Sequence, residues 1–536
     1  MKKNSGVRKP TPSSSVRSSS GQPYGRRPNP VQRTGRRRKK RPVLNKVGIS
    51  FLTIHLVVSL FFCAFTQRLG ILPPLYFGVM VLLVLILGIG VLATQMARRK
   101  QVRIAGRVLS AILIALMCVV SYYVIKADQA INNLTTTSSK KYHSMVVVVN
   151  VDDPAVSISD ASSYIFGVQY HLGAEQTEAT VADIQESLGT SIGLAEYESL
   201  SEQVAALRSG EVGAIIYNEA FTPIIEEEYE GYRDTVRVIY GFAYEDGSLV
   251  SQTGNVPSDG PSPTPMPTPR PQTPELVTDE CFSVFLSGID TYGSIGTTSR
   301  SDSNIIAVVN PETRQILLVT TPRDYYVTFP GVTGTSKDKL THAGIYGVEV
   351  SMATLSELYD LPVEYHVRVN FSSFIEIVDL LGGVDVYSEV SFRMGSKSVV
   401  KGYNYFTGKD ALSYSRERYQ LAAGDNQRGK NQQAVIAAMI QKLTSPSILA
   451  NATRIMEKVG DSVDTNFTAE QIQTMVANQI ADGTSWNIVS VAATGRGDMQ
   501  YCYSYKGRTL YVTWPDMDSI AMIKEQIQIV LDGGTL

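Results

Sequence analysis

Three short stretches decide the fold of the C-terminal half: FSVFLSG at 282–288, NIIAVV at 304–309 and QILLVT at 315–320. Each is rich in β-branched and apolar residues and is bounded by turn residues, which predicts buried strands. Three further stretches have the apolar spacing of amphipathic helices: Val348–Tyr359, Phe371–Leu381 and Gln432–Leu443. Together they predict an α/β or α+β fold in which helices cover a mixed sheet.

Charged residues stand at the ends of the three predicted strands. Asp290 directly follows the first, Arg300 and Asp302 immediately precede the second, and Arg323 and Asp324 follow the third. Ligand-binding groups usually gather at strand ends in sheets of this kind. We therefore expect these residues to contribute to a ligand site.

A second charged stretch lies further along the chain. The segment 414–418 is expected to be extended, with Arg416 and Arg418 on one side, and Asp425 and Arg428 lead into a helix. Arginine binds phosphate oxygens with a planar fork, and magnesium favours one or two carboxylates with waters and substrate phosphates. For any single pair, an ordinary surface ion pair is the simpler interpretation. The whole set favours a polyphosphate bound with a divalent cation.

A proline-rich linker divides the chain before this region. Residues 257–274 contain eight prolines and no apolar period, which predicts a semi-rigid spacer. We place the linker at 256–279 and a catalytic domain at 280–536. Strand-like and helix-like stretches alternate over 143–255, which predicts a small α/β accessory domain without a catalytic cluster.

The N-terminus is basic and then apolar. Residues 1–46 carry 15 positive charges and no acidic residue, which predicts a disordered cytoplasmic tail. Apolar runs at 47–65, 71–97 and 104–125 are each close to the length that spans a bilayer, so residues 47–126 are expected to form three transmembrane helices. Because positively charged loops stay inside, the tail is expected in the cytoplasm and everything after Lys126 outside the cell.

The charges of the 536-residue chain are unevenly distributed. The totals are 49 Lys+Arg and 50 Asp+Glu, but 22 of the basic residues precede Asp128, the first acidic residue.

With four cysteines, five histidines and no HExxH or CxxC spacing, the sequence argues against a zinc site. The basic tail has neither interleaved aromatic residues nor a helix-turn-helix pattern, which argues against nucleic-acid binding. The basic charge of the tail is better explained by membrane topology: it keeps the tail on the cytoplasmic side, where it lies against anionic lipid.

The segment from about 282 to 443 resembles the LytR–CpsA–Psr family of bacterial cell-envelope enzymes. An ordered series of motifs carries the resemblance: GID at 288–290, RSDSNII at 300–306, TTPRDYYV at 320–327, KLTHAGIYG at 339–347, VNFSSFIEIVDLLGGVDV at 369–386, GKDALSYSRERY at 408–419 and GDNQRGKNQQ at 424–433. The N-terminal plan, with its basic tail, three spans, accessory domain and spacer, is similar to the streptococcal CpsA branch, which is associated with capsule loci.

The resemblance implies transfer of an envelope glycopolymer from a polyprenyl-pyrophosphate carrier to peptidoglycan. It implies that Asp290 and Asp302 coordinate Mg²⁺, with Mn²⁺ as an alternative, and that Asp425 assists the acceptor hydroxyl. It also implies a pyrophosphate site, to which it assigns Arg300, Arg323, Arg416, Arg418, Arg428 and Gln432. The resemblance further implies that four residues are catalytic, namely Arg323, Arg416, Arg418 and Asp425. The stretch THAGIYG departs from the shorter pattern of many members, which leaves the roles of Lys339 and His342 open.

The expected partners are the lipid-linked polymer, peptidoglycan, the membrane and, beyond these, the capsule synthesis machinery. The apolar carrier needs a groove, for which the helix Phe371–Leu381 offers Phe371, Phe374, Ile375, Val378 and Leu381, although ordinary core packing explains the same spacing.

Two other functions remain open. One is a membrane-bound regulator of capsule synthesis or transcription that acts through the cytoplasmic tail. The other is a protein that binds or hydrolyses a polyprenyl pyrophosphate without transfer.

Cys281 and Cys502 are both expected outside the cell, where a disulfide is permitted. The sequence is compatible either with a disulfide bridge between these two cysteines or with two unrelated buried thiols.

Overall fold

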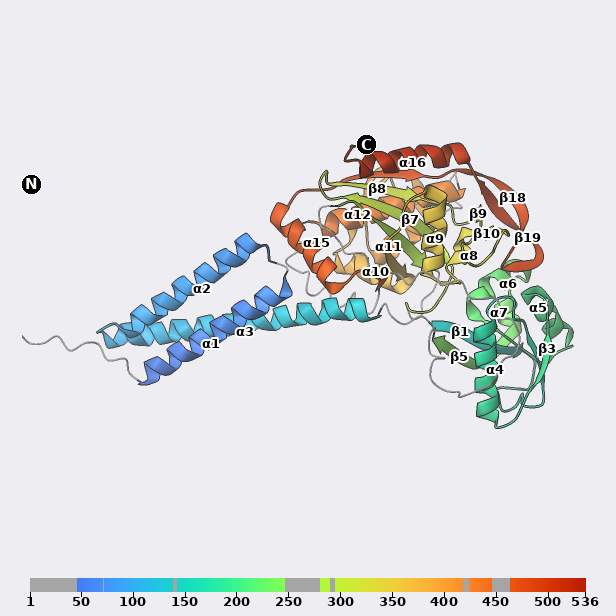
Figure 1. The fold of residues 1–536 in the computed structure, drawn as a ribbon, viewed down its shortest axis with the longest axis horizontal. Helices are drawn as coiled ribbons and strands as arrows, with labels where there is room; N and C mark the ends of the chain where they lie inside the picture. The colour runs from blue at the N-terminus through green and yellow to red at the C-terminus, as the bar shows by residue number, and fades with distance from the viewer. Residues whose placement is uncertain are drawn as a thin grey trace, which may run out of the picture.

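The computed structural model describes residues 46–70, 72–137, 142–245, 280–289, 295–417, 424–445 and 463–536. In chain order these form a group of three helices, an accessory domain and a larger domain that corresponds to the predicted catalytic domain and keeps that name below (Figure 1). The predicted basic tail before Lys46 and the predicted linker at 256–279 lie outside the described residues.

The three N-terminal helices are each long and apolar enough to cross a membrane, as the sequence predicted. They are α1 (Lys46–Leu69), α2 (Pro74–Gln95) and α3 (Lys100–Thr137). The candidate span within α3 ends at Lys126, so this helix continues for 11 residues toward the accessory domain.

The accessory domain is built on a five-stranded sheet of order β3-β2-β4-β1-β5. Its strands are β1 (Tyr142–Asn150), β2 (Ile165–Val168), β3 (Gly193–Glu196), β4 (Ala214–Asn218) and β5 (Val236–Glu245). Its helices are α4 (Ala174–Leu188), α5 (Leu200–Ser209), the short 3₁₀ turn η1 (Glu219–Phe221), α6 (Thr222–Glu228) and α7 (Tyr232–Thr235). Side chains along β1 alternate between two cores, with Val146 and Val148 on the face toward α5 and Val147 on the face toward α4.

The catalytic domain is built on a six-stranded mixed sheet of order β16-β11-β6-β7-β8-β17. Its strands are β6 (Phe282–Ile289), β7 (Ser301–Asn310), β8 (Gln315–Thr320), β11 (Tyr365–Asn370), β16 (Val463–Thr465) and β17 (Asn487–Ala492). Strand β6 runs antiparallel to β7 and parallel to β11. The three strands expected from sequence are thus β6, β7 and β8, and the predicted mixed sheet covered by helices is confirmed.

Helices cover both faces of this sheet because the strands are apolar on both sides. One face packs with α9 (Val348–Tyr359) and α16 (Met517–Leu531), through residues such as Phe285 and Leu317. The other face, which includes Val284 and Ile316, packs near α12 (Gly424–Leu443) and α15 (Ala469–Asp482).

Shorter elements complete the catalytic domain. The helices are α8 (Leu340–Ala343), α10 (Phe371–Leu380) and α11 (Gly408–Arg416). Two-stranded pairs join β9 (Tyr326–Val327) to β10 (Asp338–Lys339), β12 (Val384–Ser388) to β15 (Gly402–Phe406), β13 (Phe392–Met394) to β14 (Lys397–Val399), and β18 (Gly495–Cys502) to β19 (Tyr505–Pro515).

The accessory and catalytic domains share one hydrophobic core. Phe221 and Ile224 of the accessory domain lie in the same cluster as Ile345, Leu510 and Val512 of the catalytic domain. In Figure 1 the accessory domain adjoins the β18–β19 hairpin accordingly. A large apolar interface of this kind opposes free movement of the two domains.

The structure corrects one local expectation and decides between two alternatives for the cysteines. The segment around Arg416 is not extended: α11 continues through Arg416, and a capping box between Thr407 and Asp410 starts this helix. Cys281 and Cys502 form no bridge. The Cys281 thiol donates to the carbonyl oxygens of Val530 and Leu531, whereas Cys502 is buried in the core shared by the two domains.

Candidate active site

Asp302 lies at the centre of the charged residues, at the second position of β7. The strand is preceded by the turn that contains Ser299 and Arg300. Gly344 packs against this turn: a Cβ there would lie 2.5 Å from the carbonyl oxygen of Ser299 and 2.9 Å from the amide nitrogen of Ser301. Only glycine allows so close an approach, so this turn is fixed against the end of α8.

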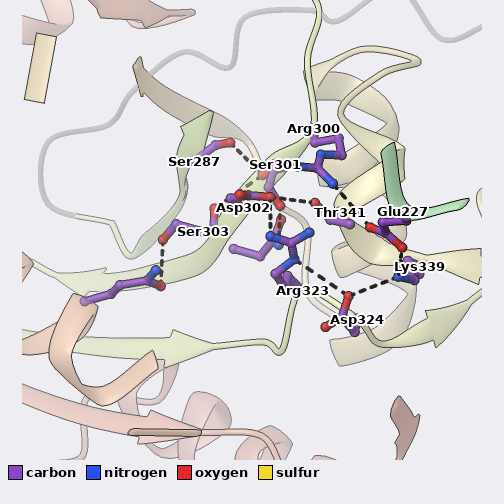
Figure 2. A network of polar contacts seen from close by, with 12 residues as sticks. Glu227, Ser287, Arg300, Ser301, Asp302, Ser303, Arg323, Asp324, Lys339 and Thr341 are labelled. Carbon is purple, nitrogen blue, oxygen red and sulfur yellow. Dashed lines mark hydrogen bonds and ion pairs between the residues drawn. The ribbon is translucent and has the colours of Figure 1, made fainter. Parts of the chain in front are cut away.

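Two groups hold the Asp302 carboxylate. Its Oδ1 lies 2.9 Å from Nη1 of Arg323 and accepts a hydrogen bond from the Thr341 hydroxyl at 3.1 Å (Figure 2). Burial acts to raise the pKa of Asp302, but the positive charges of Arg323, Arg300 and Arg428 outweigh it and lower that pKa. Asp302 is therefore a carboxylate at neutral pH.

A chain of alternating charges extends from this pair. Arg323 Nε lies 3.7 Å from Asp324 Oδ1, and the same oxygen lies 3.8 Å from Lys339 Nζ. Lys339 Nζ donates to Glu227 Oε2 at 3.1 Å. Glu227 Oε1 then lies 3.5 Å from Arg300 Nη1. Figure 2 shows that Glu227 approaches from the accessory domain, while the other members belong to the catalytic domain.

Helices α11 and α12 supply the other polar groups. Gln432 Nε2 donates to the Ser415 carbonyl at 3.3 Å, and its Oε1 accepts from the Ser303 hydroxyl at 3.2 Å. The guanidinium of Arg416 lies 4.3 Å from the centre of the Phe371 ring, a cation–π distance. Arg428 is buried one turn before Gln432 on α12.

One cavity of about 2020 Å³ joins these charged groups to an apolar region. Arg300, Asp302, Arg323, Lys339 and Gln432 line its charged end. The apolar lining comes from the sheet face and from helices α10, α12 and α15, and includes Val284, Leu286, Phe374, Ile436, Ile440 and Met475. On α12 the lining changes from Arg428 and Gln432 to Ile436 and Ile440 within three turns, so the two ends are continuous along this helix.

The comparisons with known proteins address the same region. The model of the LytR_cpsA_psr family matches residues 258–519. The polyisoprenyl-teichoic acid–peptidoglycan teichoic acid transferase TagU of Oceanobacillus iheyensis is 30% identical over 226 residues, which make up 41% of this chain and 68% of that protein. The chain belongs to the LytR–CpsA–Psr family.

Other members of the LytR–CpsA–Psr family match a similar part of the chain. TagU of Bacillus cereus is 36% identical over 200 residues, which are 37% of this chain and 64% of the relative, slightly less than two thirds of its length. The crystal structure of Bacillus subtilis TagV has 27% sequence identity and a TM-score of 0.41, and the alignment covers 48% of this chain and 99% of that one. The structure of TagT bound to LIIa-WTA has 27% identity and a TM-score of 0.39, over 47% of this chain and 91% of that one.

The structure brings most of the predicted site residues together. Those that line the single cavity are Arg300, Asp302, Arg323, Arg416, Arg428 and Gln432. Asp290 and Arg418 lie outside the described residues, and so does the side chain of Asp425. Of the predicted groove residues, Phe371, Phe374 and Ile375 line the cavity. Val378 and Leu381 instead lie in a buried core cluster one and two turns further along the chain, against which Phe374 also packs.

The structure also adds residues to the site. Lys339 lines the cavity, whereas His342 is fully buried and its Nδ1 lies 2.7 Å from Asp338 Oδ1. Asp338 Oδ2 accepts from the Ser504 amide at 2.7 Å, so this pair fastens α8 to the β18–β19 turn. Glu227 had no signal in the sequence, because it is one of three consecutive glutamates in a domain without a catalytic cluster.

Among the described residues, no group of three or more His, Cys, Asp or Glu side chains is arranged to hold a metal ion. Asp302 nevertheless suits a hard divalent cation, because its ionised carboxylate lines the cavity beside Arg300, Arg323 and Arg428. One carboxylate is enough when substrate phosphates and waters complete the coordination.

Proposed function

We propose that this protein transfers an envelope glycopolymer from a polyprenyl-pyrophosphate carrier to peptidoglycan, with capsular polysaccharide as the polymer and teichoic acid as the alternative. Relatives named as polyisoprenyl-teichoic acid–peptidoglycan teichoic acid transferases support the class of reaction. The streptococcal CpsA-like plan of the N-terminal half favours capsule over teichoic acid.

The continuous cavity is the observation that carries this proposal. A polyprenyl pyrophosphate combines a long apolar chain with a compact, multiply charged head group. The cavity matches both parts: one region is lined by apolar side chains, the other by a cluster of arginines, and Gln432 lies between them on α12. A regulator has no need of this combination, whereas a lipid-pyrophosphate hydrolase shares it.

The charged end suits attack on a phosphorus atom. In the proposed step an acceptor hydroxyl attacks the phosphorus next to the sugar, the bond to the bridging oxygen breaks, and polyprenyl monophosphate leaves with the electron pair. Negative charge grows on that bridging oxygen, and Arg300, Arg323 and Arg428 are fixed cations that would stabilise it. The hydroxyl proton would pass to a base, a role that the family resemblance gives to Asp425.

We propose Mg²⁺, or Mn²⁺, as the cofactor, held by Asp302 together with Asp290. The ion would supply additional positive charge at the phosphate oxygens. Asp302 is prepared for this role because the surrounding arginines keep it ionised.

The location of the reaction follows from the membrane helices. We propose that α1, α2 and α3 anchor the protein in the cell membrane, with both later domains outside. The basic loop Arg98–Arg99–Lys100 between α2 and α3 would then be cytoplasmic. Peptidoglycan and the lipid-linked polymer are both accessible on the outer side.

The proposal is tested with the full chain in lipid nanodiscs, supplied with lipid-linked polymer, peptidoglycan and Mg²⁺. Polymer attached to peptidoglycan is the expected product, with equimolar polyprenyl monophosphate. Release of the monophosphate without attachment would identify a hydrolase instead. Deletion of residues 1–40 should leave transfer unchanged, whereas a regulator that acts through its tail would lose its function.

A further inference from the structure

Glu227 belongs to the accessory domain but lies among the charged residues of the catalytic domain. It contacts Lys339 at 3.1 Å and Arg300 at 3.5 Å. We infer that Glu227 is a positioning residue that the accessory domain contributes to the transfer site, where it holds Lys339 and Arg300 beside the phosphate-binding groups. This inference rests on the proposed function.

The neighbours of Glu227 in sequence have a different role. Glu226 accepts from the backbone amides of Gly231 at 3.3 Å and Arg233 at 2.7 Å, and Glu228 accepts from the Ser201 hydroxyl at 3.1 Å. Both therefore stabilise the accessory domain itself. Of the three consecutive glutamates, the middle one makes the ion pairs with Lys339 and Arg300 of the catalytic domain.

Burial makes the Glu227 contacts important. The Lys339 and Arg300 side chains are only 4% and 8% exposed, so each cation requires a nearby negative charge. Burial acts to raise the pKa of Glu227, but Lys339, His342 and Arg300 lower it overall. Glu227 is therefore a fixed negative charge and a poor proton acceptor.

Loss of this charge would affect the residues further along the chain of ion pairs. The remaining carboxylate near Lys339 is Asp324, at 3.8 Å, and Asp324 also lies 3.7 Å from Arg323. Without Glu227, Lys339 is expected to move onto Asp324 and draw it away from Arg323. Arg323 is the partner of Asp302, so the disturbance reaches the centre of the site.

The docking of the two domains does not depend on Glu227. Phe221, Ile224 and Leu207 pack with Leu510 and Val512 in the shared core. Burial of such side chains stabilises the interface by far more than one partly exposed ion pair. A change of charge at position 227 should therefore alter the site without separating the domains.

The test compares Glu227→Gln, Glu227→Asp and the matched control Glu228→Gln in the full chain, assayed as above. In Glu227→Gln, kcat should fall about tenfold while the KM for the lipid-linked donor stays within about twofold, because the lost interaction acts on the transition state and the lipid chain dominates binding. Glu227→Asp keeps the charge and should retain more activity than Glu227→Gln. Glu228→Gln should behave as the wild type.

Leu510→Ala provides the comparison for a purely structural effect, because it loosens the shared core and should lower Tm. The inference is overturned if Glu227→Gln keeps its kcat, or if its Tm falls as far as that of Leu510→Ala.

A structure of Glu227→Gln tests positioning without any assay. In this variant we expect the Lys339 side chain to move within hydrogen-bonding distance of Asp324. If the position of the Lys339 side chain is unchanged, the inference is contradicted, whether or not transfer is detected. Absence of transfer by the wild type would instead contradict the proposed function.

Discussion

The two ends of the cavity are built in opposite ways. At the charged end, residues from several separate segments are held by directed contacts between 2.9 and 3.8 Å, and one of these residues, Glu227, belongs to the accessory domain. At the apolar end, the cavity is lined by apolar side chains from one sheet face and three helices. These side chains offer apolar surface and no hydrogen-bonding groups. Charge recognition depends on exact placement, whereas apolar burial depends mainly on area.

The difference predicts how each end tolerates substitution. Small changes at the charged end should impair the reaction itself. Changes at the apolar end should affect the binding of long lipid chains and little else. Four predictions test this contrast, in order of decreasing effect.

Asp302→Asn should have the largest effect. The amide keeps the size of the side chain but removes the charge that pairs with Arg323 and that would bind the metal. We expect kcat to fall about 100-fold or more, the scale reached when one electrostatic group of an active site is lost. The transfer assay with Mg²⁺ titration measures this, and near-normal turnover at saturating Mg²⁺ would refute the metal role of Asp302.

Arg323→Lys should have the next largest effect. Lysine keeps the charge but has no planar fork, so it cannot contact Asp302 and a phosphate together. Loss of one charge-assisted hydrogen bond costs about 2 kcal/mol, which corresponds to roughly 30-fold in kcat/KM. Retained activity would mean that the site needs only net positive charge. Lys430→Arg, on the exposed side of α12, is the control and should be silent.

Ile440→Asp should impair the apolar end selectively. A carboxylate in the aliphatic lining should raise the KM for a long-chain donor about tenfold, because burial of one such side chain contributes about 1.5–3 kcal/mol. A short-chain, water-soluble donor does not reach Ile440 and should be turned over as before. An equal loss with both donors would indicate that the two ends are not independent.

The charged end should contribute to the pH dependence of stability through Asp302. The pKa of Asp302 is lower in the folded protein than in the unfolded chain, where an aspartate has a pKa near 3.9. Its contribution is therefore present above about pH 4 and is lost as the pH falls through the lower, folded-state pKa, where the unfolded state binds the proton first. Thermal unfolding of the full chain in detergent from pH 7 to pH 3 should show a smaller decrease for Asp302→Asn than for the wild type. Parallel curves would contradict this.

Much of the fold could be predicted from the sequence. The predicted helix Val348–Tyr359 coincides with α9, and the strand predicted at 315–320 coincides with β8. The apolar runs correspond to α1, α2 and α3. These features depend on the periodicity and composition of neighbouring residues, which a sequence displays directly.

The site was only partly predictable. Arg300, Asp302 and Arg323 stood out because they flank strands, and the family motifs added Arg416, Arg428 and Gln432. The conformation around Arg416 was predicted wrongly, because the capping box at Thr407 starts a helix that continues through Arg416, where the charged residues suggested an extended segment. Val378 and Leu381 share the apolar spacing of Phe374 but are enclosed in the core, whereas Phe374 also lines the cavity, and only the tertiary packing around the helix makes this distinction.

By itself the sequence determined the order of the domains, the membrane helices, the main strands and the family, since all of these are recorded in local patterns and motifs. Only the tertiary structure decided that Glu227 contacts Lys339, that Cys281 and Cys502 stay apart, and that apolar side chains and arginines line one cavity. Glu227 and Lys339 are 112 positions apart, and their contact depends on the packing of Phe221 and Ile224 against the β18–β19 hairpin. Such a contact follows from the burial of apolar surface between domains, which no local period or spacing encodes.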